Sequence, residues 1–152
     1  MQKPSSFAYN ALVPLSPFVN YTVQSDRVNA VFTPDTAAHL NAAFSELNKD
    51  GIVPQINSAF RTDADQTRMQ NGGSGSNPAA KMSWHQAGAA LDINGTSSRQ
   101  FPTIISVMKS HGFVWGGDFN SHKDPPHFDG RNFSGNLFSG YLLGQGYWNA
   151  TH

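Results

Sequence analysis

The stretch SWHQAGAALDING, from Ser83 to Gly95, joins one histidine and one aspartate through a run of small residues. The gap between His85 and Asp92 is filled mainly by Ala87, Gly88, Ala89 and Ala90. Small residues let two backbone segments approach closely, and glycine permits turns that other residues resist. A turn at Gly88 that leads into an extended AALDI strand would bring the imidazole and the carboxylate to one point. Such a pair indicates a metal site, a catalytic pair or a buried hydrogen bond.

The composition of the chain restricts the chemistry available to this pair. The 152 residues fit one domain with a single core, and 11 phenylalanines supply the apolar volume for it. The formal net charge is zero, so a nucleic-acid partner, which requires a basic stripe, is not expected. The absence of cysteine excludes disulfides, thiolate metal sites and thiol nucleophiles. Any metal must therefore be held by histidine, aspartate or glutamate.

The first half of the chain contains two predicted helices and one predicted strand. Residues 1–32 carry three prolines and no helical period, so we expect an irregular arm with one short strand near Tyr21–Val23. Thr33-Pro34-Asp35 is a helix start, and an apolar helical period then continues until Gly51. IVPQINSAFR, residues 52–61, favours a strand, with Pro54 at a sheet edge or a bulge. Thr62 is expected to cap a short helix that runs to about Gln70.

The second half alternates strands with one helix. Residues 71–81 are predicted to form a loop, and AALDI a strand. FPTIISVMKSHG is predicted to form a helix that ends at Gly112, and FVWGG and HFDG favour two further strands. The Gly- and aromatic-rich tail, 131–152, gives no clear prediction. This order predicts an α+β fold, with a small antiparallel sheet and flanking helices, in one domain that spans 1–152.

A third candidate ligand lies in HKDPPHFDG, residues 122–130. The two prolines after Asp124 favour a polyproline-like backbone with three residues per turn, which would place Asp124 and His127 on the same side. Two imidazoles and one carboxylate are a common protein ligand set for catalytic zinc. We therefore expect His85, Asp92 and His127 to bind Zn²⁺, and Asp124 to act as general base on the attacking water.

Four motifs of the chain resemble those of one enzyme family. SWHQAGAALDI is similar to the S-x-H-x-x-G-x-A-x-D motif of the zinc D-alanyl-D-alanine carboxypeptidases, a family that includes the phage L-alanyl-D-glutamate endopeptidases. DPPHF, SAFRTDADQ and FVWGGDF resemble its other motifs, in the family's order, between Ser58 and Asp129. The resemblance implies a hedgehog-like peptidase fold and makes Arg61 a clamp for the substrate carbonyl or oxyanion. Phe60, where tyrosine is common, and an aspartate base depart from the pattern, and the aspartate favours the phage-type branch.

Several residues near these motifs have competing interpretations. His122 is a rival ligand to His127, and Asp118 is a candidate hydrogen-bond partner for a ligand imidazole. Arg61 has the alternative of pairing with one of the aspartates that follow it. The candidates for contact with substrate are Trp115, Ser83 and Gln66. A core position is the alternative for Trp115, and a structural hydrogen bond is the alternative for Gln66.

The resemblance implies a zinc peptidase that cuts peptidoglycan stem peptides, most specifically between L-Ala and D-Glu. The alternatives are a D-alanyl-D-alanine carboxypeptidase and a non-catalytic, zinc-stabilised module that binds the cell wall. We expect a monomer that acts at the bacterial cell wall or in the periplasm. The N-terminal residues resemble neither a signal peptide nor a membrane span, so release as a phage lysin or specialised secretion is expected.

Overall fold

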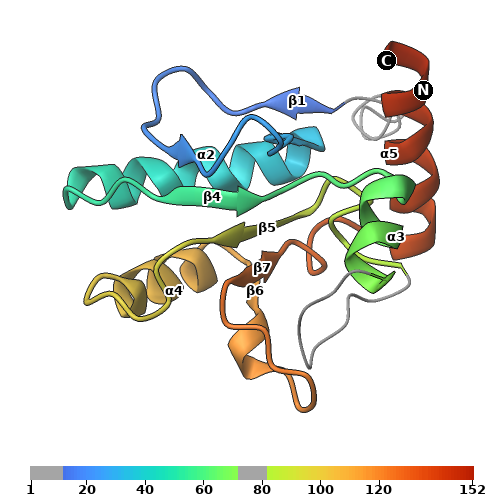
Figure 1. Ribbon diagram of the computed structural model, residues 1–152. Helices are drawn as coiled ribbons and strands as arrows, with labels where there is room; N and C mark the ends of the chain where they lie inside the picture. Colours follow the sequence, from blue (N-terminus) through green and yellow to red (C-terminus); the bar gives the residue numbers. More distant parts are fainter. Residues whose placement is uncertain (1–11, 72–81) are drawn as a thin grey trace.

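The computed structural model describes residues 12–71 and 82–152, which form a mostly antiparallel sheet with helices around it (Figure 1). In sheet order the strands are β2 (Thr22–Val23), β4 (Gln55–Ser58), β5 (Ala90–Ile93), β7 (His127–Asp129) and β6 (Val114–Trp115). Only the β2–β4 pair is parallel among these neighbours. A separate antiparallel pair consists of β1 (Val13–Pro14) and β3 (Val31–Phe32). The predicted α+β class is confirmed.

Several helix ends coincide with signals that the sequence carries. They are α2 (Pro34–Lys49), α3 (Asp63–Asn71), α4 (Phe101–Ser110) and α5 (Leu137–Thr151), with a short 3₁₀ turn at Gly116–Asp118. Thr33 caps α2 by accepting a hydrogen bond from the Thr36 amide. Before α3, the Thr62 hydroxyl accepts from the Asp65 amide while the Asp65 carboxylate accepts from the Thr62 amide. The left-handed backbone predicted at the end of α4 is present at Gly112, with φ of 92°.

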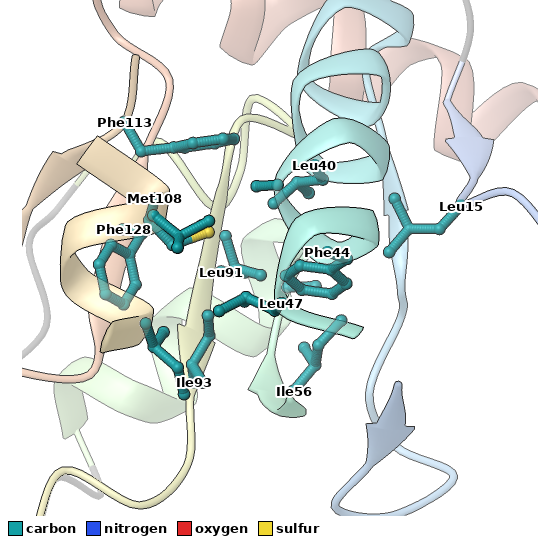
Figure 2. Close-up of a cluster of buried hydrophobic side chains, with 14 of the residues drawn as sticks. Leu15, Leu40, Phe44, Leu47, Ile56, Leu91, Ile93, Met108, Phe113 and Phe128 are labelled. Atoms are coloured by element: carbon teal, nitrogen blue, oxygen red, sulfur yellow. The ribbon is translucent and has the colours of Figure 1, made fainter. Parts of the chain in front are cut away.

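The hydrophobic core lies between one face of the sheet and helices α2 and α4 (Figure 2). Successive side chains of a strand point to opposite faces. Leu91 and Ile93 of β5 and Phe128 of β7 therefore enter the core, fully buried. Asp92 and His127, which alternate with them, emerge on the other face. The strand period thus separates a packed face from a polar face.

Two predictions for the chain before α3 were wrong in part. The arm is not merely irregular, because β1 and β3 pair within it and Leu15 and Phe32 belong to the core. β4 is not at a sheet edge, because it pairs with both β2 and β5. Pro54 lies just before β4, where its missing N–H removes no bond from the ladder and its carbonyl accepts from Thr22 at 3.0 Å. The irregular register occurs later, between Ile56 and Ser58.

The tail that the sequence left unassigned forms α5, which lies beside α3 at one end of the sheet (Figure 1). Its glycines lower helix propensity, so the helix depends on packing against the rest of the chain. The predicted loop at 71–81 falls, from residue 72 on, outside the described residues. None of the helices in the described segments has the length and apolar character that crossing a membrane requires.

Candidate metal centre

Neighbouring strands bring the three predicted ligands together on the polar face of the sheet. Asp92 of β5 pairs with His127 of β7, and His85 lies in the turn before β5. Asp92 Oδ1 is 3.3 Å from His85 Nε2 and 3.6 Å from His127 Nδ1. One ligand atom from each residue lies within 4.8 Å of the others. The sequence interval of seven residues between His85 and Asp92 is closed by the turn at Gly88, where φ is 74°.

The unsatisfied oxygen of Asp92 is the observation that tests whether this cluster fits a metal ion. Asp92 Oδ1 is buried and has no hydrogen-bond partner in the described part of the chain, although it faces the nitrogens of two imidazoles. Buried polar atoms are rarely left without a partner, so such an atom needs an explanation. A divalent cation among two imidazole nitrogens and this carboxylate oxygen supplies one.

Each imidazole is fixed by a hydrogen bond from its other nitrogen. His85 Nδ1 lies 2.7 Å from the carbonyl oxygen of Ala59, which can only accept, so Nδ1 donates and Nε2 keeps a free lone pair. His127 Nε2 lies 2.7 Å from a carboxylate oxygen of Asp129, which leaves Nδ1 free on the side of Asp92. Such partners set the tautomer and orientation of metal-binding histidines.

Asp129 is a hydrogen-bond partner of a predicted ligand, His127, and sequence reasoning missed it. It is fully buried and accepts hydrogen bonds from Arg131 Nε at 2.8 Å and Arg131 Nη2 at 2.7 Å, besides the one from His127. Burial acts to raise the pKa of Asp129, but the bonds from Arg131 and His127 outweigh it and lower this pKa to about 2. The signal was the spacing in HFDG, since residues two apart on a strand share a face.

Asp118, the predicted partner for a ligand imidazole, is not in this position. Its carboxylate pairs with Lys109 Nζ at 2.7 Å, and the side chain is half exposed. The prediction was wrong because Asp118 lies in the 3₁₀ turn after β6, whereas Asp129 lies on the same strand as His127. The partner of His127 is therefore better predicted from residues that share its strand face than from residues that are merely near it in sequence.

Asp124 lies beside the cluster without being one of its three members. Its Oδ2 is 3.9 Å from His127 Nδ1, and about half of the side chain is exposed. The backbone is a turn, in which the His127 amide donates to the Asp124 carbonyl at 3.0 Å, and not the predicted polyproline helix. The fixed φ of proline suits both conformations, and both bring the two side chains together. Burial and the nearby charge of Asp92 raise the pKa of Asp124.

Arg61 reaches the same cluster from the end of β4. Its guanidinium donates from Nε to Ser58 Oγ at 3.0 Å and from Nη1 to Gln66 Oε1 at 3.2 Å, and Nη2 forms an ion pair with Asp92 Oδ2 at 3.2 Å. These bonds use three of the five N–H donors of the side chain. The alternative pairing with the aspartates of α3 does not form, because the guanidinium turns toward Asp92 instead.

The electrostatics of the cluster concentrate negative charge on Asp92. Burial acts to raise the pKa of Asp92, but the two imidazoles and Arg61 outweigh it, so this pKa lies far below its ordinary value. Burial lowers the pKa of His85. For His127 burial acts in the same direction, but the carboxylates of Asp129 and Asp92 prevail and raise its pKa to about 9. An ionised carboxylate between two imidazoles is the charge arrangement that attracts a divalent cation.

Comparison with known proteins finds a family model that matches the segment carrying this cluster. Residues 76–130 match the family model described as D-alanyl-D-alanine carboxypeptidase, and the matched segment holds all three cluster residues and Asp124. The matched segment is less than half of the chain and agrees with the resemblance inferred from the motifs. Two imidazoles and one carboxylate make zinc the cofactor that fits this site. Arg61 lies outside the matched segment, so its role stays a prediction.

Solved structures of peptidoglycan enzymes share the fold of this chain. An L-Ala D-Glu endopeptidase of Serratia marcescens, ChiX, is 21% identical, covers 68% of this chain and 85% of its own, and has a TM-score of 0.54. The LD-carboxypeptidase LdcB is 16% identical over 88% and 75% of the two chains, with a TM-score of 0.59. A variant of the vancomycin-resistance D,D-pentapeptidase VanY in complex with Zn(II) is 17% identical over 95% and 99%, with a TM-score of 0.54.

The three residues predicted to contact substrate form hydrogen bonds within or beside the candidate site. The Trp115 indole donates to the Pro125 carbonyl at 2.7 Å, within the turn that carries Asp124. Ser83 Oγ accepts from the His85 amide at 3.1 Å, and Gln66, which is buried, accepts from Arg61. Contact of these three residues with substrate stays a prediction. His122 is exposed, with φ of 55°, and does not belong to the three-residue cluster.

Proposed function

We propose that this chain is a zinc peptidase that hydrolyses peptidoglycan stem peptides at the bond between L-Ala and D-Glu. The observation that carries the proposal is a buried metal-ligand set, His85, Asp92 and His127, with Asp124 beside it but outside it. That arrangement separates metal binding from proton transfer, as peptide hydrolysis requires. Structural similarity to an L-Ala D-Glu endopeptidase, an LD-carboxypeptidase and a D,D-pentapeptidase supports a cell-wall peptide as substrate.

Zinc, when bound, polarises the scissile carbonyl and makes a water molecule easier to deprotonate near neutral pH. Asp124 is the group of this chain that takes the proton from the attacking water and delivers it to the leaving amine. Its raised pKa suits that exchange, because a stronger base than an ordinary aspartate accepts the proton more readily. Half exposure of the side chain leaves room for substrate and water to reach it.

Arg61 would stabilise the negative charge that develops on the carbonyl oxygen. Its side chain is only 11% exposed, and bonds to Ser58, Gln66 and Asp92 hold the guanidinium in one orientation. Burial lowers the pKa of Arg61, yet a guanidinium stays protonated at any working pH. Preorganised donors of this kind act mainly in the transition state, where one donor is worth about 3 to 4 kcal/mol.

Removal of terminal D-Ala is the second candidate, because the matching family is described as D-alanyl-D-alanine carboxypeptidase. The endopeptidase activity is preferred because the base is an aspartate, in the DPPHF form that resembles the phage enzymes. A third possibility, binding without hydrolysis, is disfavoured because both Asp124 and Arg61 are present at the site. In each case the chain would act at the bacterial cell wall.

Digestion of purified muropeptides by the zinc-loaded protein, with the products weighed by mass spectrometry, separates these candidates. Endopeptidase action yields a disaccharide that carries only L-Ala, together with the freed remainder of the stem. Release of D-Ala alone would replace the proposed bond by the carboxypeptidase one. Binding of muropeptides with no product, in a preparation shown to contain zinc, would support the binding module. His85→Ala and Asp124→Asn serve as inactive controls.

A further inference from the structure

Helix α5 approaches the turn that carries His85 more closely than ordinary side chains would permit. A Cβ added at Gly144 would lie 2.9 Å from the Gln86 carbonyl oxygen, and one added at Gly140 would lie 3.1 Å from Ala87 Cβ. Contacts this short are tighter than packed side chains normally tolerate. The small residues after His85 and the glycines of α5 therefore allow the turn and the helix to pack in close contact.

The contact buries the polar side chain of Gln145, and all of its amide groups are used. Its Oε1 accepts from the Asp63 amide at 3.0 Å, and its Nε2 donates to the Arg61 carbonyl at 2.8 Å and to the Gln86 carbonyl at 3.0 Å. Gln145 thus joins three segments: Asp63 at the start of α3, Arg61, and Gln86, which follows His85. A hydrophobic side chain in its place would remove the partner that Gln145 provides to three backbone groups.

The backbone on either side of Arg61 is tied to the same helix. The Arg61 amide donates to the His85 carbonyl at 3.1 Å, so the bonds of Gln145 complete a bridge between two segments that already touch. Phe60, immediately before Arg61, packs its ring 5.2 Å from that of Trp148 on α5. On the other side, the Tyr141 hydroxyl donates to the Asp63 carboxylate at 3.1 Å. Helix α5 therefore holds residues 60–63 at three successive points.

We propose that Gln145 is a positioning residue, which places Arg61 against the metal cluster through the Arg61 backbone. The inference rests on the proposed catalytic role of Arg61. The guanidinium is 3.2 Å from Asp92, and a shift of its backbone carries it away from the developing oxyanion. Misplacement of a catalytic group by about 1 Å lowers the rate on the order of a hundredfold. Gln145 can therefore affect turnover although it touches no reacting atom.

The test compares Gln145→Glu with Asn149→Asp. Glutamate keeps the shape and the acceptor of Gln145 but removes the two donors, whereas Asn149 is exposed on the same helix and gives a control of equal charge change. In Gln145→Glu we expect kcat to fall on the order of tenfold or more, with KM and zinc content unchanged. Asn149→Asp should match the wild type. Gly144→Ala, which leaves the amide intact but forces α5 away from Gln86, is the second variant and should lose kcat in the same way.

A structural readout distinguishes this inference from the proposed function. The Nε–H resonance of Arg61, identified by its absence in Arg61→Lys, reports the bond from Arg61 to Ser58. It should shift or broaden in both α5 variants and stay in place in Asn149→Asp. An unchanged resonance, or an unchanged kcat in the folded variants, overturns the inference. If the zinc-loaded wild type hydrolyses nothing, the proposed function fails, and the resonance alone decides whether Gln145 positions Arg61.

Discussion

Asp124 lies close enough to the cluster to exchange a proton there without being one of its three members. Its Oδ2 lies 3.9 Å from His127 Nδ1, and it does not join the group of three. Asp124→Asn keeps the size of the side chain but removes its basicity. We expect kcat to fall on the order of a hundredfold or more while zinc content stays that of the wild type. Metal analysis beside steady-state kinetics checks this. Zinc loss as complete as in His127→Ala would make Asp124 a ligand.

Arg61 provides a separate test of chemistry against substrate binding. A lysine at this position keeps the charge but offers a compact ammonium in place of the planar fork that reaches Ser58, Gln66 and Asp92. If the guanidinium acts in the transition state, Arg61→Lys lowers kcat by roughly tenfold to a hundredfold with little change in KM. Steady-state kinetics on one defined muropeptide gives both constants. A rise in KM alone would assign Arg61 to a ground-state carboxylate of the substrate.

Asp129 should matter for metal affinity more than for turnover at saturating zinc. Its carboxylate orients His127 from behind, at 2.7 Å, and Arg131 holds it in turn. Asp129→Asn weakens this support, and loss of such partners typically lowers metal affinity about 10- to 100-fold. Competition with a chromophoric chelator measures the change. The matched control is Asp118→Asn, which replaces an aspartate of the same region that pairs with Lys109, and wild-type affinity is expected there.

For individual residues, the sequence predicted the members of the candidate metal cluster better than the residues that hydrogen-bond to them. His85, Asp92 and His127 were identifiable because two imidazoles and a carboxylate in motif spacing have few other uses. Asp129 was overlooked, although it lies only two residues beyond His127 and shares its strand face. Its role depends on the bond from Arg131 and on complete burial, and neither follows from the order of residue types.

Among the elements, the turn that carries Asp124 depends on a glycine of the neighbouring segment. A Cβ at Gly116 would overlap the Asp124 carbonyl oxygen and would lie 2.9 Å from His127 Cβ, and the Asp124 amide donates to the Gly116 carbonyl at 3.0 Å. Gly116→Ala should therefore displace the turn and lower kcat by tenfold or more, on the scale expected for misplacement of the base. Gly146→Ala is the control, because open space surrounds Gly146 on α5. Equal kinetics in both variants would refute the dependence.

Elements with strong local signals were predictable, and those that depend on distant contacts were not. Helix α2 carries its own cap at Thr33 and a regular apolar stripe, so its start and its buried face followed from the sequence. Helix α5 has a weak apolar pattern and several glycines, because its close contact with Gln86 requires small residues. The segment after Asp124 is predicted to be polyproline-like but forms a turn, because two prolines fix φ and leave both conformations open.

At the scale of the whole molecule, packing and chemistry occupy opposite faces of one sheet. The core side chains of β5 and β7 face α2 and α4 (Figure 2). The predicted metal ligands Asp92 and His127 alternate with them along these strands and lie on the other face. Hydrophobic burial against two helices is the main source of stability, and it does not require the metal. The ligands also have protein partners of their own, Ala59 for His85 and Asp129 for His127. The site is thus largely held in place by the fold.

Zinc removal should therefore lower the stability of this chain without unfolding it. Free zinc at about 100 times its dissociation constant adds about 2.7 kcal/mol to the free energy of unfolding, which corresponds to roughly 5–11 °C in Tm for a chain of this size. We expect a chelator to lower Tm by that amount and to leave the far-ultraviolet circular dichroism at 25 °C unchanged. His127→Ala should have a Tm that no longer responds to zinc. Loss of the helical spectrum on chelation would instead show that the metal organises the fold, as it does in small zinc modules whose folding depends on the ion.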